Sequence, residues 1–166
     1  LLHWLRLHAA GFFVPFPNRH VNNIYFDTHH QAAFAENLSG ASSRNKVRYR
    51  WYGQSVPPDA GVLEVKRKRN YFGWKLRYPV ENAPYTEDAR WQEIYKLLRG
   101  QLPHAGKVWL QSNPVPVLIN RYYRRYFLSS NGKVRATVDT RQAVWDQRIK
   151  PYPNFDHRAN LPRTLV

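Results

Sequence analysis

Polar and apolar residues alternate along several segments of the chain, which is the pattern of a β-strand with one face toward a core. The clearest segment is KVRYRWY at 46–52, where Lys46, Arg48 and Arg50 alternate with the apolar or aromatic residues at 47, 49 and 51. An Asn-Gly pair at 131–132 tolerates the positive φ of a tight hairpin, and it predicts a turn over 129–132. The alternation predicts strands over 21–27, 46–52, 61–68, 74–80, 117–128 and 133–140, with a further strand over 143–148.

Helix signals occupy the intervals between these strands. The predicted helices run over 1–10, 29–38 and 87–98, and a glycine follows each of them closely. Thr28 and Thr86 can cap the second and third helices, since a hydroxyl oxygen accepts from the first free backbone N–H groups. In the third helix Trp91, Ile94 and Leu98 fall on one face, which we expect to pack against the sheet. Two prolines predict a loop over 53–60.

The chain has 166 residues, of which 43% are hydrophobic, and this suffices for one packed domain. It shows no internal repeat, low-complexity segment or linker, so we expect a single α+β domain over 1–166. Because Met is absent and the chain begins at Leu1, we expect a piece of a longer protein, with another strand beginning at 165–166. Cysteine is also absent, which excludes disulfides and thiolate chemistry. This stretch shows no charged-then-apolar leader pattern and no apolar run of roughly 20 residues, so we expect a cytoplasmic protein.

The charge balance indicates a domain that binds a polyanion. The chain has 26 Lys and Arg against 11 Asp and Glu, a formal net charge of +15. Nucleic acid, an anionic membrane and phosphate-rich small molecules are the candidate partners. The basic residues are threaded through strands rather than gathered in a tail. They therefore line either the solvated outer face of a sheet or the polar interior of a curved or closed one.

Repetition of the pattern on five strands favours the polar interior, a basic tunnel with a few carboxylates. Narrow phosphate chains suit such a tunnel, because Arg grips phosphate oxygens bidentately and Lys adds a point charge. The carboxylates could hold a divalent metal that bridges phosphate oxygens. The candidate residues on strand faces are Lys46, Arg48, Arg50, Glu64, Lys66, Lys68, Lys75, Arg77, Arg121, Arg135 and Asp139.

Six segments, in order, resemble the VTC domain, the polyphosphate polymerase domain of the triphosphate tunnel metalloenzyme (CYTH-like) superfamily. VNNIYFDT at 21–28 resembles its NxIYFDT signature, and KVRYRWYG at 46–53 resembles its KxRxRWYG strand. The remaining matches are LEVKRK at 63–68, KLR at 75–77, NRY at 120–122 and RATVDT at 135–140. The resemblance covers nearly the whole chain.

The resemblance implies an antiparallel β-barrel around a basic tunnel, with helices packed outside. It implies transfer of the γ-phosphate of ATP onto polyphosphate, with Mn²⁺ or Mg²⁺. Arg48, Arg50 and Lys66 would hold the triphosphate, and Arg121 and Arg135 would grip it from the other side. Further phosphate contacts would come from Lys46, Lys68, Lys75 and Arg77, and the metal contacts from Glu64 and Asp139. The family's first strand would precede Leu1, and its main metal-binding Glu would follow Val166, so this barrel would lack a strand at each end.

The residues leave several functions open. Polyphosphate synthesis is the leading one, and a triphosphatase or polyphosphatase of the same fold differs only in its acceptor. A non-catalytic module that binds polyphosphate or inositol pyrophosphate needs the tunnel but not the carboxylates. Binding of single-stranded nucleic acid is the least favoured. In the tunnel interpretation Arg48→Ala or Arg121→Ala abolishes triphosphate binding, whereas Lys107→Ala has little effect.

Overall fold

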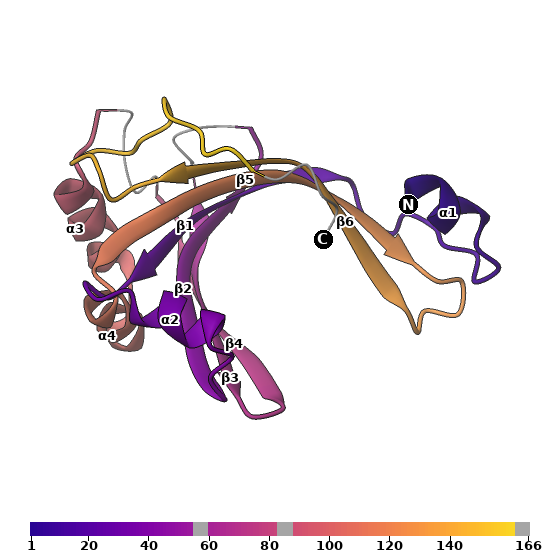
Figure 1. The fold of residues 1–166 in the computed structure, drawn as a ribbon, viewed down its shortest axis with the longest axis horizontal. Helices are drawn as coiled ribbons and strands as arrows, with labels where there is room; N and C mark the ends of the chain where they lie inside the picture. The colour runs from indigo at the N-terminus through magenta and orange to yellow at the C-terminus, as the bar shows by residue number, and fades with distance from the viewer. Residues whose placement is uncertain (55–59, 83–87, 162–166) are drawn as a thin grey trace.

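The computed structural model describes residues 1–54, 60–82 and 88–161, which form a curved antiparallel sheet with helices against it (Figure 1). The strands pair in the order β4-β3-β2-β1-β5-β6. Their bounds are β1 Arg19–Asp27, β2 Ser43–Tyr52, β3 Gly61–Arg69, β4 Phe72–Val80, β5 Val115–Leu128 and β6 Arg135–Asp146. The helices are α1 Leu2–Leu7, α2 Ala32–Leu38, α3 Trp91–Gln101 and α4 His104–Ser112.

The strands predicted from alternation are confirmed, with small shifts at their ends. The segments 133–140 and 143–148 belong to one strand, β6, whose register with β5 shifts midway. At this irregularity Arg141 takes a positive φ of 54°. The predicted hairpin turn is also confirmed, because Gly132 has a φ of 70° and its N–H donates to the carbonyl of Ser129 at 2.8 Å.

The helices differ more from expectation. Helix α2 begins at Ala32, three residues later than predicted, and Gln31 rather than Thr28 is at its N-cap position. Thr28 still contributes, because its Oγ1 accepts from the N–H of Ala32 at 3.0 Å. The Asp27 carboxylate accepts from the N–H groups of Ala33 and Phe34 at 2.9 and 3.0 Å. Helix α3 continues through Gly100 and ends only before Pro103, which forces the preceding residue into extended backbone. Helix α4 was not predicted, because its N-cap is Pro103 and no polar side chain caps it. Thr86, the two prolines of the 53–60 loop and residues 165–166 lie outside the described residues.

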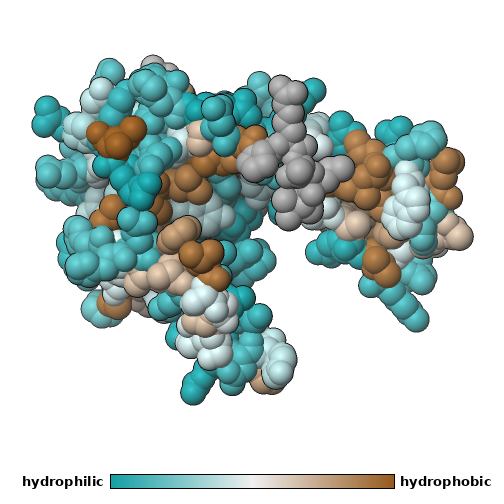
Figure 2. Space-filling model, in the orientation of Figure 1, coloured by the Kyte–Doolittle hydropathy of each residue, from teal (hydrophilic) through white to brown (hydrophobic). Residues whose placement is uncertain are grey.

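The apolar face of the sheet packs against α3 and α4. Val47, Tyr49 and Trp51 of β2 are at most 1% exposed and join one cluster with Ile94 and Leu98 of α3. The predicted apolar face of this helix is therefore confirmed. A smaller cluster forms where α1 packs on the far ends of β5 and β6, from Leu5, Phe127 and Val138. Hydrophobic side chains remain on the surface of this lobe, at the right of Figure 2, among them Leu1, Trp4 and Leu7.

The sheet is curved but it is not closed, so the expected barrel is not observed. Within the described residues β4 and β6 are the two edge strands, and neither pairs with the other. Figure 1 shows an arch, with α3 and α4 on its outer side and α2 beneath it, beside the end of β2. Small barrels close when about eight strands share a consistent tilt and stagger. The six strands here provide only part of such a wall, so the polar side of the sheet is an open concave face.

Candidate functional site

Strand register places the predicted basic residues of β2, β3 and β4 on the concave face. Residues that lie directly opposite each other on neighbouring strands share a face of the sheet. Arg48 pairs with Glu64, which pairs in turn with Arg77. One step along, Lys46 pairs with Lys66, and Lys66 with Lys75. The alternation in the sequence therefore predicted this face correctly.

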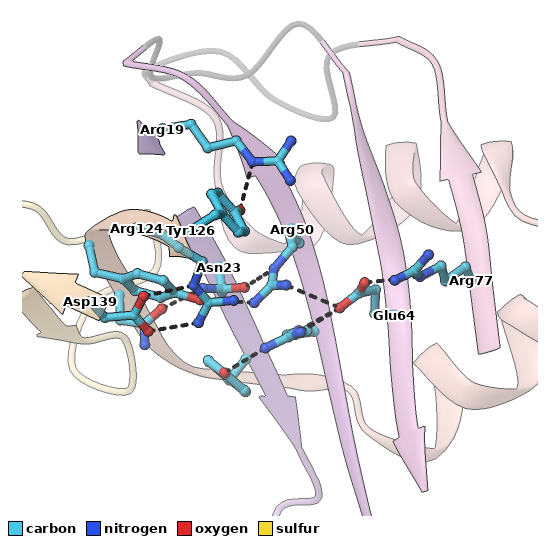
Figure 3. A network of polar contacts seen from close by, with 12 residues as sticks. Arg19, Asn23, Arg50, Glu64, Arg77, Arg124, Tyr126 and Asp139 are labelled. Carbon is cyan, nitrogen blue, oxygen red and sulfur yellow. Dashed lines mark hydrogen bonds and ion pairs between the residues drawn. The ribbon is translucent and has the colours of Figure 1, made fainter. Parts of the chain in front are cut away.

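Glu64 is the centre of a group of three arginines (Figure 3). Its Oε2 accepts from Arg48 Nε at 2.9 Å and from Nη2 at 2.5 Å. Arg50 Nη1 lies 3.7 Å from the same oxygen, and Arg77 Nε lies 3.3 Å from Oε1. Arg48, Arg50 and Glu64 are all buried, whereas the Arg77 side chain is 64% exposed. One carboxylate thus faces three guanidinium groups, and the cluster retains a net positive charge.

Electrostatics fix the ionisation state of this cluster. Burial by itself would raise the pKa of Glu64, but the hydrogen bonds from Arg48 and the charges of Arg50 and Arg77 lower it overall. Burial would lower the pKa of Arg48, but its contacts with Tyr25 and Glu64 raise it overall. Glu64 is therefore a carboxylate whose role here is to hold and orient arginines. Its lone pairs are already engaged.

The cluster extends across β1 and β5 through residues that the sequence did not single out. Arg50 Nε donates to Asn23 Oδ1 at 2.8 Å, and Arg50 Nη2 donates to the hydroxyl of Tyr122 at 3.1 Å. Arg48 Nη1 donates to the hydroxyl of Tyr25 at 3.1 Å. Both arginines are held from two sides, so they are pre-organised rather than mobile. In both contacts the phenol oxygen accepts, so each hydroxyl group could still donate to an anion.

A second ion pair lies farther along the same face. Arg124 donates through Nε and Nη2 to the two oxygens of Asp139, both at 2.7 Å. Beyond it, Arg19 donates to the hydroxyl of Tyr126 at 2.9 Å and stacks over Tyr52 at 4.0 Å (Figure 3). These contacts continue the basic and aromatic character of the concave face toward α1.

Lysines line a cavity of about 410 Å³ beside the arginine group. Its walls include Arg44, Lys46, Lys66, Lys68 and Lys75. Like charges directly opposite one another on neighbouring strands repel. Partial burial and the nearby charges of Arg48, Lys75 and Arg50 lower the pKa of Lys66 to about 8. An anion in this cavity would relieve the repulsion.

Two predicted phosphate-binding residues are not brought to this group. Arg121 pairs with Asn22, which pairs with Trp51 of the core, so Arg121 lies on the opposite, outer face. Its Nε donates to Asn22 Oδ1 at 2.7 Å. Arg135 does lie on the concave side, but it pairs with Leu128 at the far end of β5. Eight residues of strand separate that position from Asn120, roughly 26 Å along the chain.

The residues missed by the sequence analysis are Asn23, Tyr25, Tyr122 and Arg124. Asn23 and Tyr25 occur in the NNIYFD segment. Because they are two positions apart in a predicted strand, the sequence could have shown that they share one face. The NRYYRRY segment of β5 has polar or aromatic residues at every position, so its alternation could not show which residues lie on the concave face. Arg121 was assigned to the wrong face for that reason, and Tyr122 and Arg124 lie on the concave face instead.

The carboxylates do not fit a metal ion as they are arranged. Glu64 is engaged by three arginines, and Asp139 forms a two-pronged pair with Arg124. Across residues 1–54, 60–82 and 88–161, no three His, Asp or Glu residues come together in a way that could hold a metal. Dependence on Mn²⁺ or Mg²⁺ stays a prediction.

Comparison with known families adds one match. The family model described as the VTC domain matches residues 15–165, which include every strand described above. No curated protein matches the chain in a sequence search. In the described part of the chain, no helix is long and apolar enough to cross a bilayer.

Proposed function

Because the chain belongs to the VTC domain family, we propose that its concave face binds triphosphate and polyphosphate and transfers a phosphoryl group from ATP to a polyphosphate chain. The observation that carries the proposal is the excess of positive charge on one face of β2, β3 and β4. Eight basic side chains share this face with a single carboxylate, that of Glu64. They are Arg44, Lys46, Arg48, Arg50, Lys66, Lys68, Lys75 and Arg77.

A linear polyanion suits this arrangement better than a compact one. On each strand the basic residues of this face lie about 6.7 Å apart, because side chains on one face recur every second residue. Neighbouring phosphorus atoms share one bridging oxygen and lie less than half that distance apart. Every second or third phosphate of an extended chain could therefore contact the next basic residue along a strand. Arg48 and Arg50 would act as bidentate grips, with the lysines adding point charges.

The catalytic task is mostly electrostatic. Phosphoryl transfer needs the donor and acceptor in line and its charge neutralised, with little covalent work for the protein. Arg48 and Arg50, already oriented by Glu64, Asn23 and Tyr122, would stabilise the transferred group and the leaving diphosphate without reorganising. A terminal phosphate as acceptor makes the protein a polymerase, whereas water makes it a hydrolase.

A non-catalytic polyphosphate or inositol pyrophosphate sensor is the second candidate. The observation that favours it is the full engagement of Glu64 and Asp139 by arginines. A sensor needs the cationic face but no free carboxylate. The two candidates share their ligand and differ in turnover.

Turnover with ATP separates these functions. We expect the protein, incubated with ATP and Mn²⁺, to produce a ladder of polyphosphate on a stained polyacrylamide gel, and Arg48→Ala to remove the ladder. Phosphate release from tripolyphosphate without a ladder would instead identify a hydrolase. If tripolyphosphate binds but neither product forms, the enzyme proposal fails and the sensor replaces it.

Titration of Lys66 should make tripolyphosphate affinity depend on pH. Its pKa in the free protein is lowered to about 8, and a bound polyanion favours the charged ammonium. Binding near pH 8 should therefore take up protons, and affinity should fall as pH rises from 7 to 9. Calorimetric titration with tripolyphosphate in buffers of different ionisation enthalpy measures this uptake.

The control for this result is Lys66→Gln, whose polar side chain is one bond shorter and cannot titrate in this pH range. The uptake near pH 8 should shrink in this variant. Uptake that is the same in Lys66→Gln would assign the titrating group elsewhere.

A further inference from the structure

The outer face of the sheet carries a group of cationic side chains that takes no part in the concave face. Alternation along β5 places Ile119, Tyr123 and Phe127 on this outer face, opposite to Tyr122 and Arg124. Ile119 belongs to the core under α3 and α4, and Phe127 belongs to the small cluster under α1, at the other end of the arch (Figure 1). Tyr123 therefore lies between the two apolar clusters and belongs to neither.

Two arginines and a histidine surround the ring of Tyr123. The guanidinium carbons of Arg125 and Arg141 lie 5.9 and 5.8 Å from the centroid of this ring. The ring of His20 lies 5.0 Å from it, measured between centroids. These contacts come from three neighbouring strands, because His20 of β1 and Thr140 of β6 both pair with Tyr123 of β5. The register of the sheet thus gathers two positive charges and an imidazole around one phenol ring.

Among the described residues, no carboxylate balances these charges. The outward-facing positions of β1, β5 and β6 around Tyr123 hold no Asp or Glu, and neither Arg125 nor Arg141 forms an ion pair in the part of the chain that the structure describes. On the concave face, by contrast, Arg50 lies near Glu64 and Arg124 pairs with a carboxylate of its own. An anion bound at the outer face would therefore supply the missing counter-charge.

Both arginines have a feature that favours contact with a ligand. Arg125 Nε is buried and has no hydrogen-bond acceptor among the described residues. A buried donor without an acceptor is unfavourable, so Arg125 gains by turning its guanidinium toward an anion. Arg141 is exposed and lies at the register shift of β6, with a positive φ of 54°. Irregularities of this kind redirect a side chain, and strained backbone is concentrated at functional sites.

The number of oxygen atoms decides which anion fits. Arg124 uses both oxygens of Asp139, each at 2.7 Å, so a single guanidinium already occupies a whole carboxylate. Two guanidinium groups and an imidazole therefore need more acceptors than one carboxylate offers. A phosphate group has three terminal oxygens and about two negative charges at neutral pH, and arginine binds it through two parallel hydrogen bonds.

We propose that Arg125, Arg141 and His20 form a second anion site, on the outer face of the sheet, which binds a phosphate group independently of the concave face. The site goes beyond the proposed function, because it lies on the side of the sheet opposite to Arg48 and Arg50. Either a small phosphorylated molecule or a polyphosphate chain could present the phosphate group. Ion pairs that are open to water are weak, so we expect this site to bind more weakly than the concave face.

Titration of the ¹⁵N-labelled protein with pyrophosphate tests this site, because the Nε–H signal of each arginine reports on its own guanidinium in an NMR spectrum. We expect the signal of Arg50 to change first and that of Arg125 to change in a second, weaker step. Arg141→Gln should weaken only the second step, by about tenfold, since it removes one charge-assisted contact. Glutamine suits this backbone, because Gln31 has the same φ of 54°.

The matched control is Arg69→Gln, which removes the same charge from an exposed position at the end of β3. It should leave both steps unchanged. An equal loss in Arg69→Gln and Arg141→Gln would overturn the site, because it would reduce the second step to a general effect of charge.

The two arginine signals also separate this site from the concave face. If Arg50 responds to saturating pyrophosphate and Arg125 does not, the outer site is overturned while binding at the concave face stands. If Arg125 responds alone, the outer site stands and binding at the concave face fails. The Arg50 signal further shows that each variant is folded, since Arg50 is buried on the opposite face.

Two further ligands identify the source of the phosphate group. A second step at least tenfold tighter with long-chain polyphosphate than with pyrophosphate would identify the polymer. Equal affinities would identify a small phosphorylated molecule, and both results support the site. A response of Arg125 to a single-stranded oligonucleotide alone, with none to either phosphate ligand, would indicate a nucleic-acid surface and overturn the proposal.

Discussion

Arg50→Ala is expected to weaken tripolyphosphate binding about 100-fold, whereas Arg121→Ala leaves the affinity unchanged. Arg50 lies on the concave face and is oriented by Asn23 and Tyr122 before any ligand arrives. Each hydrogen bond from a buried guanidinium to phosphate is worth about 1.5–3 kcal/mol, and tenfold in affinity corresponds to about 1.4 kcal/mol. Losing one or two such bonds gives the stated effect, which calorimetric titration would measure.

Arg121 is the matched control for Arg50 because it has the same charge but lies on the outer face. Its replacement leaves Asn22 Oδ1 without its donor, so we expect a loss of about 1 kcal/mol in stability and no change in binding. The sequence alone predicted that both Arg48 and Arg121 are essential for binding. Equal loss of binding in Arg50→Ala and Arg121→Ala would contradict the concave-face assignment.

Glu64→Gln is expected to lower the free energy of unfolding by about 3–5 kcal/mol. Removing one member of a buried ion pair leaves uncompensated charge in a poorly solvated place. Here the residual charge is that of Arg48 and Arg50, both less than 9% exposed. The glutamine amide would also point N–H donors at guanidinium groups that can only donate. Urea unfolding at neutral pH measures the change.

Tripolyphosphate should restore part of this loss, because an anion bound to the folded state alone stabilises it. The control is Asp139→Asn, which breaks an ion pair whose side chains are about a quarter exposed and should destabilise the fold less. A Glu64→Gln protein within 1 kcal/mol of wild type would show that the carboxylate does not hold the arginines together.

Protonation of Glu64 at low pH should lower the stability of the fold, as Glu64→Gln does. Its pKa in the folded protein lies below the ordinary value of 4.5, so the carboxylate contributes stability above that value. This contribution is lost as pH falls through the lower, folded-state pKa. The wild-type protein should therefore lose more stability than Glu64→Gln between about pH 5 and the onset of acid unfolding.

The sequence determined the strands and the basic face of β2, β3 and β4. Polar and apolar residues alternate from Lys46 to Trp51 and from Leu63 to Lys66, so the position in the sequence alone assigns each of these side chains to a face. The same local chemistry identified the Asn-Gly hairpin and the contribution of Thr28 to the start of α2. These features depend on residues within a few positions of each other, and they lie within residues 15–165, which the family model matches.

Only the tertiary structure decided which residues meet across the sheet. Tyr122 contacts Arg50, which is 72 positions away in the chain. Arg121, the residue before Tyr122, lies on the opposite, outer face. In β5 neither face is apolar throughout, so alternation along the sequence could not show which side chains share a face. Partners in an antiparallel sheet are set by register, and register depends on pairing over long sequence separations. The sequence therefore determined the charge of the site, and the register of the strands determined its members.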